Sequence, residues 1–82
     1  MFSADRIKQI LEEKLPGCEA RVFDDAGDGE HFSAEVTSSS FAGKSLVQQH
    51  QLVYGALGEL MKRDIHALAL KTFAPDRWPH RS

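Results

Sequence analysis

The apolar residues near the start of the chain recur with the period of a helix. Four of them fall at i, i+3, i+4 and i+8, which places them on one stripe: Ile7, Ile10, Leu11 and Leu15. Ser3 precedes this stripe as a helix cap, and Pro16 and Gly17 follow it as a stop. The sequence therefore predicts a first helix between Ser3 and Leu15.

Two segments with alternating apolar and polar residues follow, and an acidic turn joins them. The first covers residues 18–23, the turn residues 24–29, and the second about residues 31–37. The inward positions are Cys18, Ala20 and Val22 on the first strand and Phe32, Ala34 and Val36 on the second. Gly27 and Gly29 can take the positive φ that a tight turn requires. The pattern indicates a half-buried β-hairpin.

A longer helix is predicted to begin at Ser45, because Ser45 and Gln48 have the S-x-x-Q spacing of a capping box. Its apolar stripe is Leu46, Val47, Val53, Tyr54, Leu57, Leu60 and Met61. Its other face is polar and includes Gln48, Gln49, Gln51, Glu59 and Lys62. Gly55 and Gly58 interrupt the pattern and mark close packing or a kink.

The last part of the chain predicts a strand over residues 65–73 and a helical turn at Pro75 that lays Trp78 on the body. The fold class is α/β (α+β): a single small domain with the order α-β-β-α-β-α. A right-handed crossover into the third strand gives a three-stranded mixed sheet with the helices on one face and the other face partly open. The ordered core is expected over about residues 3–78, and a frayed tail over residues 79–82.

Composition narrows the class of protein. The chain has 82 residues, 41% hydrophobic and 27% charged, which is typical of one globular domain. Its net charge of -2 gives no general attraction to nucleic acid or to an anionic membrane. One cysteine, Cys18, excludes an internal disulfide and any cysteine-only metal site within one chain. Without an apolar membrane span or a secretory leader, the expected location is the reducing cytoplasm.

Several motifs together resemble the BolA family. They are Gly-Asp-Gly-Glu-His-Phe at residues 27–32, Phe-Ala-Gly-Lys-Ser-Leu-Val-Gln-Gln-His-Gln-Leu-Val-Tyr at residues 41–54, and Ile-His-Ala-Leu at residues 65–68, followed by Thr72 and Pro75. The resemblance runs from about residue 5 to Trp78, and the turn is most similar to that of the IbaG branch. It implies a fold similar to class II KH domains.

The resemblance also implies partners. Members of the BolA family pair with monothiol CGFS glutaredoxins and share a [2Fe-2S] cluster in iron-sulfur trafficking and iron regulation. Glutaredoxin and its glutathione supply part of the ligand set, so no cofactor is expected in the isolated chain. Some members are described as DNA-binding regulators of morphology and stress genes, which makes a DNA-binding transcriptional regulator the alternative function.

In the family, the cluster ligands are the histidine of the Ile-His-Ala-Leu motif, here His66, and a Cys or His of the loop between the first two strands. That loop holds neither residue in this chain. It offers only aspartates, with His31 just after them as the nearest substitute: Asp24, Asp25 and Asp28. Strand alternation puts His31 on the outward side and His66 on the inward side, which argues partly against the pair. We predict His66 and His31 as the metal ligands, with a turn aspartate as the lesser alternative to His31.

The remaining candidate ligands have plainer interpretations. His66 itself could instead bond a backbone carbonyl where its strand begins. Cys18 is interpreted as a small buried hydrophobe, His50 as a buried, hydrogen-bonded residue of the apolar helix stripe, and His80 as a solvated tail residue.

No pattern in the sequence indicates an enzyme, because Ser45 is used as a cap and no Gly-x-Ser-x-Gly, P-loop or paired carboxylate occurs. For DNA binding, the candidates are four basic residues that could form a local face: Lys44, Lys62, Arg63 and Lys71. The segment from Ser38 onward could also imitate a helix-turn-helix. The acidic turn and the net charge argue against DNA. Alone, the chain is expected to be a monomer or a weak homodimer.

Overall fold

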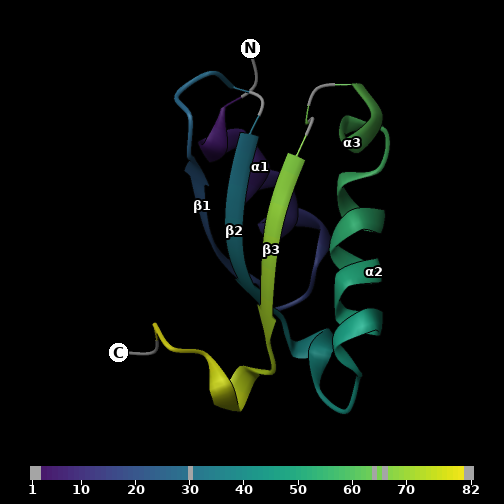
Figure 1. Ribbon diagram of the computed structural model, residues 1–82. Helices are drawn as coiled ribbons and strands as arrows, with labels where there is room; N and C mark the ends of the chain where they lie inside the picture. Colours follow the sequence, from purple (N-terminus) through teal and green to yellow (C-terminus); the bar gives the residue numbers. More distant parts are fainter. Residues whose placement is uncertain (1–2, 30, 64, 66, 81–82) are drawn as a thin grey trace.

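The computed structural model describes residues 3–29, 31–63, 65 and 67–80. In chain order, its elements are α1 (Ala4–Lys14), β1 (Glu19–Asp24), β2 (His31–Thr37), a 3-10 turn (Ser39–Phe41), α2 (Leu46–Leu57), α3 (Leu60–Arg63), β3 (Ala67–Phe73) and a second 3-10 turn (Pro75–Arg77). Figure 1 shows the sheet with α1 crossing behind it and α2 running beside β3. None of the helices in these ranges is long and apolar enough to span a bilayer.

The sheet has the strand order β1-β2-β3, so β2 is central and β3 is an edge strand. β1 and β2 form an antiparallel hairpin in which Asp24 pairs with Phe32. β2 and β3 are parallel, and the register pairs His31 with Ala67 and Thr37 with Phe73. The predicted mixed sheet is therefore confirmed, because the helical crossover brings the third strand in parallel to the second.

The core fills the space between the helices and one face of the sheet. The sheet contributes Ala20, Phe32, Ala34 and Val36, and the helices contribute Ile7, Ile10, Leu11, Val53, Ala56 and Leu57. Phe41 and Ile65 close the ends of this core, at 0% and 1% exposure. The predicted α+β class with helices on one face is confirmed.

Both predicted helix starts are confirmed by their caps. The Ser3 hydroxyl accepts a hydrogen bond from the amide of Arg6 at 3.1 Å. At α2, the Gln48 amide donates to the Ser45 hydroxyl at 3.2 Å, and the Ser45 amide donates to the Gln48 side-chain oxygen at 3.0 Å. These two reciprocal bonds form a complete capping box.

The helix that follows Ser45 is divided at Gly58. Gly58 has φ 56° and ψ -127°, a conformation that is essentially restricted to glycine, and it ends α2 with its amide bonded to the Tyr54 carbonyl. The short α3 begins two residues later. Of the two glycines in the predicted helix, Gly58 is thus a break, while Gly55 lies within α2.

The predicted apolar stripe of α2 is partly wrong. Val53 and Leu57 of this stripe are buried, as predicted, but Leu46, Val47 and Tyr54 are exposed, at 64%, 66% and 38%. The other buried residues of α2 are Gln49 and Ala56. Gln49 can be buried because its side-chain amide donates to the carbonyl of Lys44 at 3.0 Å. α2 is therefore rotated so that Leu46 and Tyr54 lie outside the core.

Trp78 and His80, near the end of the described chain, both contact the body of the domain. Trp78 is 7% exposed and packs edge-on against Phe73, with ring centroids 5.8 Å apart, which confirms the prediction that its ring lies on the body of the domain. His80 is exposed, as predicted, but its ring also contacts three side chains of the domain. Its Nε2 lies 2.7 Å from a carboxylate oxygen of Glu35, its Nδ1 accepts from the guanidinium of Arg21 at 2.8 Å, and its ring packs on Trp78. We call these contacts the C-terminal clasp.

Candidate functional site

The turn between β1 and β2 is built by its own acidic residues. The Asp24 carboxylate accepts from the amide of Gly29 at 3.0 Å, and the Asp25 carboxylate accepts from the Ser33 hydroxyl at 3.0 Å. Gly27 and Gly29 take φ values of 68° and 72°, as a tight turn requires. Asp24 and Asp25 are thus used to hold the turn, which makes them less suited to a metal than the histidine that follows.

His31 begins β2 with its side chain half exposed and held by Asp28. One oxygen of the Asp28 carboxylate accepts from the His31 main-chain amide at 3.1 Å. The other lies 2.8 Å from the ring nitrogen Nδ1. A carboxylate on one ring nitrogen fixes the tautomer and the ring plane, which is the usual second contact of metal-binding histidines. If His31 binds a metal, it would do so through Nε2.

His66, the first predicted ligand, lies outside the described residues. Its neighbour Ala67 begins β3 and is the register partner of His31. The two strands therefore begin side by side at the same end of the sheet (Figure 1). The His66 and His31 ligand pair stays a prediction.

Cys18 is not poised to act as a ligand. It lies one residue before β1, contrary to the predicted strand start, and it is half-buried against the core. Burial and the nearby Glu12 carboxylate raise the pKa of its thiol to about 12. Because the thiolate is the form that binds metals and attacks electrophiles, this environment keeps the sulfur unreactive. Its interpretation as a small hydrophobe agrees with these contacts.

His50 is half-buried rather than buried, and its ring packs edge-on against Tyr54 at 6.4 Å. Within the described ranges, its ring makes no hydrogen bond, so the predicted bonded core histidine is not found. Across those same residues, no group of three or more His, Cys, Asp or Glu side chains could enclose a metal ion. A metal held here would therefore need ligands from outside the described set.

The four basic candidates lie on three different parts of the fold. Lys44 precedes α2, while Lys62 and Arg63 follow it on α3. A helix of 12 residues separates these positions by about 18 Å. Lys71 lies on β3, and α2 is preceded only by the 3-10 turn Ser39–Phe41. The segment that could imitate a helix-turn-helix therefore consists of this 3-10 turn and α2, and the resemblance stays a prediction.

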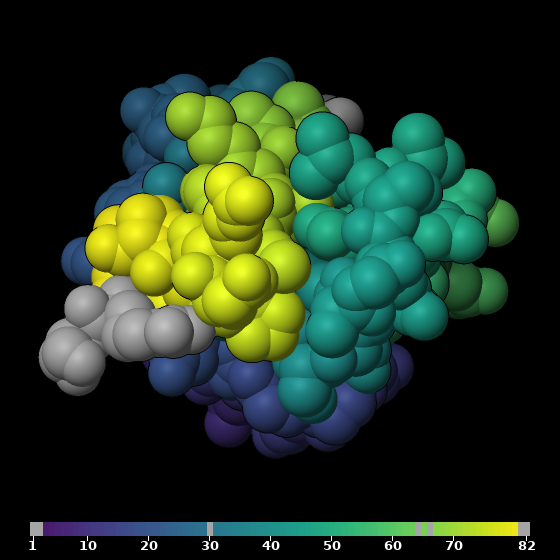
Figure 2. Space-filling view, turned by 90° about the horizontal axis from the view of Figure 1, so that it is seen from below, coloured from purple at the N-terminus to yellow at the C-terminus, as the bar shows by residue number. Residues whose placement is uncertain are grey.

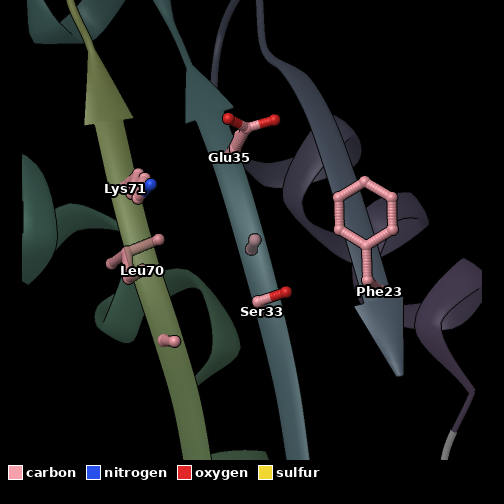
Figure 3. Close-up of a pocket in the computed structure, with 7 residues that line it drawn as sticks. Phe23, Ser33, Glu35, Leu70 and Lys71 are labelled. Carbon is pink, nitrogen blue, oxygen red and sulfur yellow. The ribbon is translucent and has the colours of Figure 1, made fainter. Parts of the chain in front are cut away.

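The helix-free face of the sheet carries a shallow hollow of about 350 Å³. Figure 3 shows its labelled residues on the three strands, with the Phe23 ring on one side and Leu70 and Lys71 on the other. It is lined by Phe23, Ser33, Ala34, Glu35, Ala69, Leu70 and Lys71. Phe23 is 48% exposed on this face, so the surface is open and partly apolar. Such a surface suits docking better than it suits catalysis.

Two features of these surfaces were missed from the sequence. Arg21 and Glu35 are register partners on the open face of the sheet. Their pairing could have indicated that a polar side chain from elsewhere in the chain, here His80, bonds both of them. The sequence pattern puts Leu46, His50 and Tyr54 on the apolar stripe, but it did not show that they form a separate row at i, i+4 and i+8 in which Leu46 and Tyr54 are exposed.

The chain matches the family model described as BolA-like protein over residues 9–77. It is 38% identical over 80 residues to Protein BOLA2 of Arabidopsis thaliana, covering 95% of this chain and 85% of that protein. It is 30% identical over 83 residues to the DNA-binding transcriptional regulator BolA of Escherichia coli (strain K12), covering 88% and 79%. The structure of a bolA protein homologue from Coxiella burnetii superposes with a TM-score of 0.80 at 43% identity, covering 93% of this chain and 95% of that one.

Proposed function

Because this chain belongs to the family of BolA-like proteins, we propose that it is a non-enzymatic iron-sulfur accessory protein. It docks a monothiol CGFS glutaredoxin and shares a [2Fe-2S] cluster with it. Its role is in iron-sulfur cluster trafficking or in iron regulation.

The observation that carries this proposal is the pair formed by Asp28 and His31. An imidazole with 53% of its side chain exposed stands at the edge of the molecule, where a partner protein can reach it. The carboxylate at 2.8 Å orients the ring before any metal arrives. This arrangement suits a ligand that completes a cluster brought by another protein.

The proposed ligand set is divided between the two proteins. His31 and His66 supply two ligands, while glutaredoxin and its glutathione supply the remaining two. Neutral imidazole is a suitable ligand for iron-sulfur centres that use histidine in place of cysteine. Cys18 is left out, because its protonated and half-buried thiol is a poor ligand.

Visible circular dichroism of holo-glutaredoxin mixed with this protein tests the proposal. We expect a changed cluster spectrum with the wild type, and loss of that change with His66→Ala and with His31→Ala. His50→Gln is the matched control, because His50 is outside the proposed ligand set and outside the C-terminal clasp. An unchanged spectrum with the wild type would contradict the proposal. An equal response from His66→Ala and the wild type would remove His66 as a ligand.

A second measurement separates docking from ligation. Isothermal titration of apo-glutaredoxin into each variant measures binding without a cluster. We expect His31→Ala and His66→Ala to retain this binding while losing the spectral change. If both variants lose apo binding, the histidines act at the protein interface and not as ligands.

The alternative function is DNA-binding transcriptional regulation. The relative in Escherichia coli and another in Haemophilus influenzae carry the name DNA-binding transcriptional regulator BolA, which favours this alternative. The separated positions of Lys44 and Lys62 and the net charge of -2 weigh against it. A gel-shift series decides: sequence-dependent binding of promoter DNA that persists at about 150 mM salt would favour DNA.

A further inference from the structure

α2 carries an apolar stripe that the core does not use. Leu46, His50 and Tyr54 follow one another at i, i+4 and i+8, next to the buried stripe that contains Gln49 and Val53. Leu46 is 64% exposed and Tyr54 is 38% exposed. The edge-on packing of His50 on Tyr54 gives part of this stripe a fixed shape.

This stripe borders the edge of the sheet. A hollow of about 290 Å³ separates the start of α2 from β3, and we call it the α2–β3 groove. It is lined by Leu46, His50, Leu70, Lys71, Thr72 and Phe73. In Figure 2 the teal surface of α2 stands beside the green and yellow surface of β3 and the residues after it.

The β3 side of the groove offers main-chain hydrogen bonds. Among the strands of the described residues, β3 pairs only with β2. Alternate amide and carbonyl groups of an edge strand point away from the sheet, where another extended segment can pair with them. The groove thus combines a free strand edge with an apolar wall, which are the two elements of strand-addition sites.

Charge and alternation define the segment that would fit. Leu70 and Thr72 point to the helix side of the sheet, and Lys71 points to the helix-free side. Lys71 makes no ion pair with any described residue, and one carboxylate oxygen of its register partner Glu35 lies 2.7 Å from Nε2 of His80. A strand added to β3 would therefore place one set of side chains on the apolar stripe of α2 and the alternate set beside Lys71.

We propose that the α2–β3 groove binds an extended peptide segment with alternating apolar and acidic residues, which adds to β3 as a fourth strand. Its apolar residues contact Leu46 and His50, and its acidic residues lie beside Lys71. A second copy of this chain fits less well. Antiparallel pairing of two β3 strands would put both Lys71 side chains on the same face of the joined sheet.

A fluorescein-labelled octapeptide of alternating Glu and Val tests this proposal by fluorescence anisotropy, with ¹⁵N NMR to locate it. We expect saturable binding and shifts of amide signals in β3 and the first turns of α2. A peptide of the same composition with its Val and Glu residues in two blocks should bind about tenfold more weakly, because it cannot alternate. Peptides methylated on the backbone nitrogens that face β3 should also lose binding.

Two protein variants form a matched pair. Leu46→Glu and Val47→Glu each add one charge at an exposed position of the first turn of α2, at 64% and 66% exposure, but only Leu46 lines the groove. We expect Leu46→Glu to weaken binding about tenfold and Val47→Glu to change it less than about threefold. Lys71→Glu should shift the preference to an alternating Lys and Val peptide.

Three results would overturn the proposal: no saturable binding by the wild type, equal effects of Leu46→Glu and Val47→Glu, or amide shifts confined to other strands. Sedimentation of the protein alone tests the other occupant. A dimer that Leu46→Glu dissociates would assign the groove to a second copy. The peptide assay contains no glutaredoxin, iron or glutathione, so its failure leaves the proposed cluster function standing, and the converse also holds.

Discussion

The C-terminal clasp should stabilise the whole domain, and His80→Ala measures by how much. Arg21 can only donate, so Nδ1 of His80 must accept and Nε2 must carry the proton that Glu35 receives. With this arrangement the His80 ring bonds Arg21 on β1 and Glu35 on β2 at the same time.

The structure gives the magnitude of the effect. Hydrogen bonds to charged groups contribute about 1.5 to 3 kcal/mol when buried, and solvent exposure of Arg21 and His80 lowers this to about 1 kcal/mol for each of the two bonds. The edge-on contact with Trp78 at 5.0 Å adds about 0.5 kcal/mol. Freeing the segment after Trp78 returns about 1 kcal/mol of conformational entropy to the variant. The net loss is about 1.5 kcal/mol, which corresponds to about 6 to 12 °C in Tm for a domain of this size.

The assay uses the one tryptophan of the chain, which lies inside the clasp. Urea unfolding followed by Trp78 fluorescence gives the free energy of unfolding, and acrylamide quenching gives the exposure of the ring in the native state. We expect both a lower midpoint and stronger quenching in His80→Ala. His80→Gln should recover part of the loss, because its amide can donate and accept. A Tm within about 1 °C of the wild type, together with unchanged quenching, would refute the clasp.

Three further predictions concern local structure and the thiol. Gly58→Ala should destabilise the domain by about 1 to 3 kcal/mol, because Gly58 ends α2 in a backbone conformation that alanine rarely adopts. Gly55→Ala should stabilise the domain by up to about 1 kcal/mol, because Gly55 is helical and an added Cβ would meet open space. Equal effects of the two substitutions on urea unfolding would contradict these assignments. Ser45→Ala should cost about 1 kcal/mol through the lost bond from the Gln48 amide, measured as a lower urea midpoint with unchanged m-value. Cys18 should resist iodoacetamide at pH 8 until urea unfolds the chain, because burial raises its pKa to about 12. The thiol of the unfolded chain ionises near its ordinary pKa of 9.0, whereas the thiol of the folded chain ionises near 12. The stability that this group contributes is therefore present below about pH 9 and is lost as the pH rises toward 12. Unfolding midpoints measured as a function of pH test this prediction.

The elements whose signals are local could be predicted from the sequence. Ser3 and Ser45 cap their helices through residues three positions away, and the turn glycines fix the hairpin within a few residues. The position of His31 at the start of β2 was predicted for the same reason.

The features that depend on distant residues were not predicted. The burial of Gln49 depends on how α2 rotates against the sheet and on the carbonyl of Lys44. The clasp joins His80 to Arg21 across 59 positions of sequence, beyond the reach of any periodic pattern. At the candidate site, the contact between Asp28 and the His31 ring was not predicted. The glycines predict a turn, but they do not specify its exact shape, which decides which of the turn carboxylates faces the ring.

The parallel register of β2 and β3 also has a consequence for how the chain folds. Every pair in this register joins residues 36 positions apart, from His31 with Ala67 to Thr37 with Phe73. The hairpin of β1 and β2 needs only its short turn, so it can form early, whereas β3 can join only after α2 has spanned the gap. During synthesis, β2 would be an exposed edge until β3 leaves the ribosome. The central strand of the finished sheet is thus the aggregation-prone edge of the unfinished one.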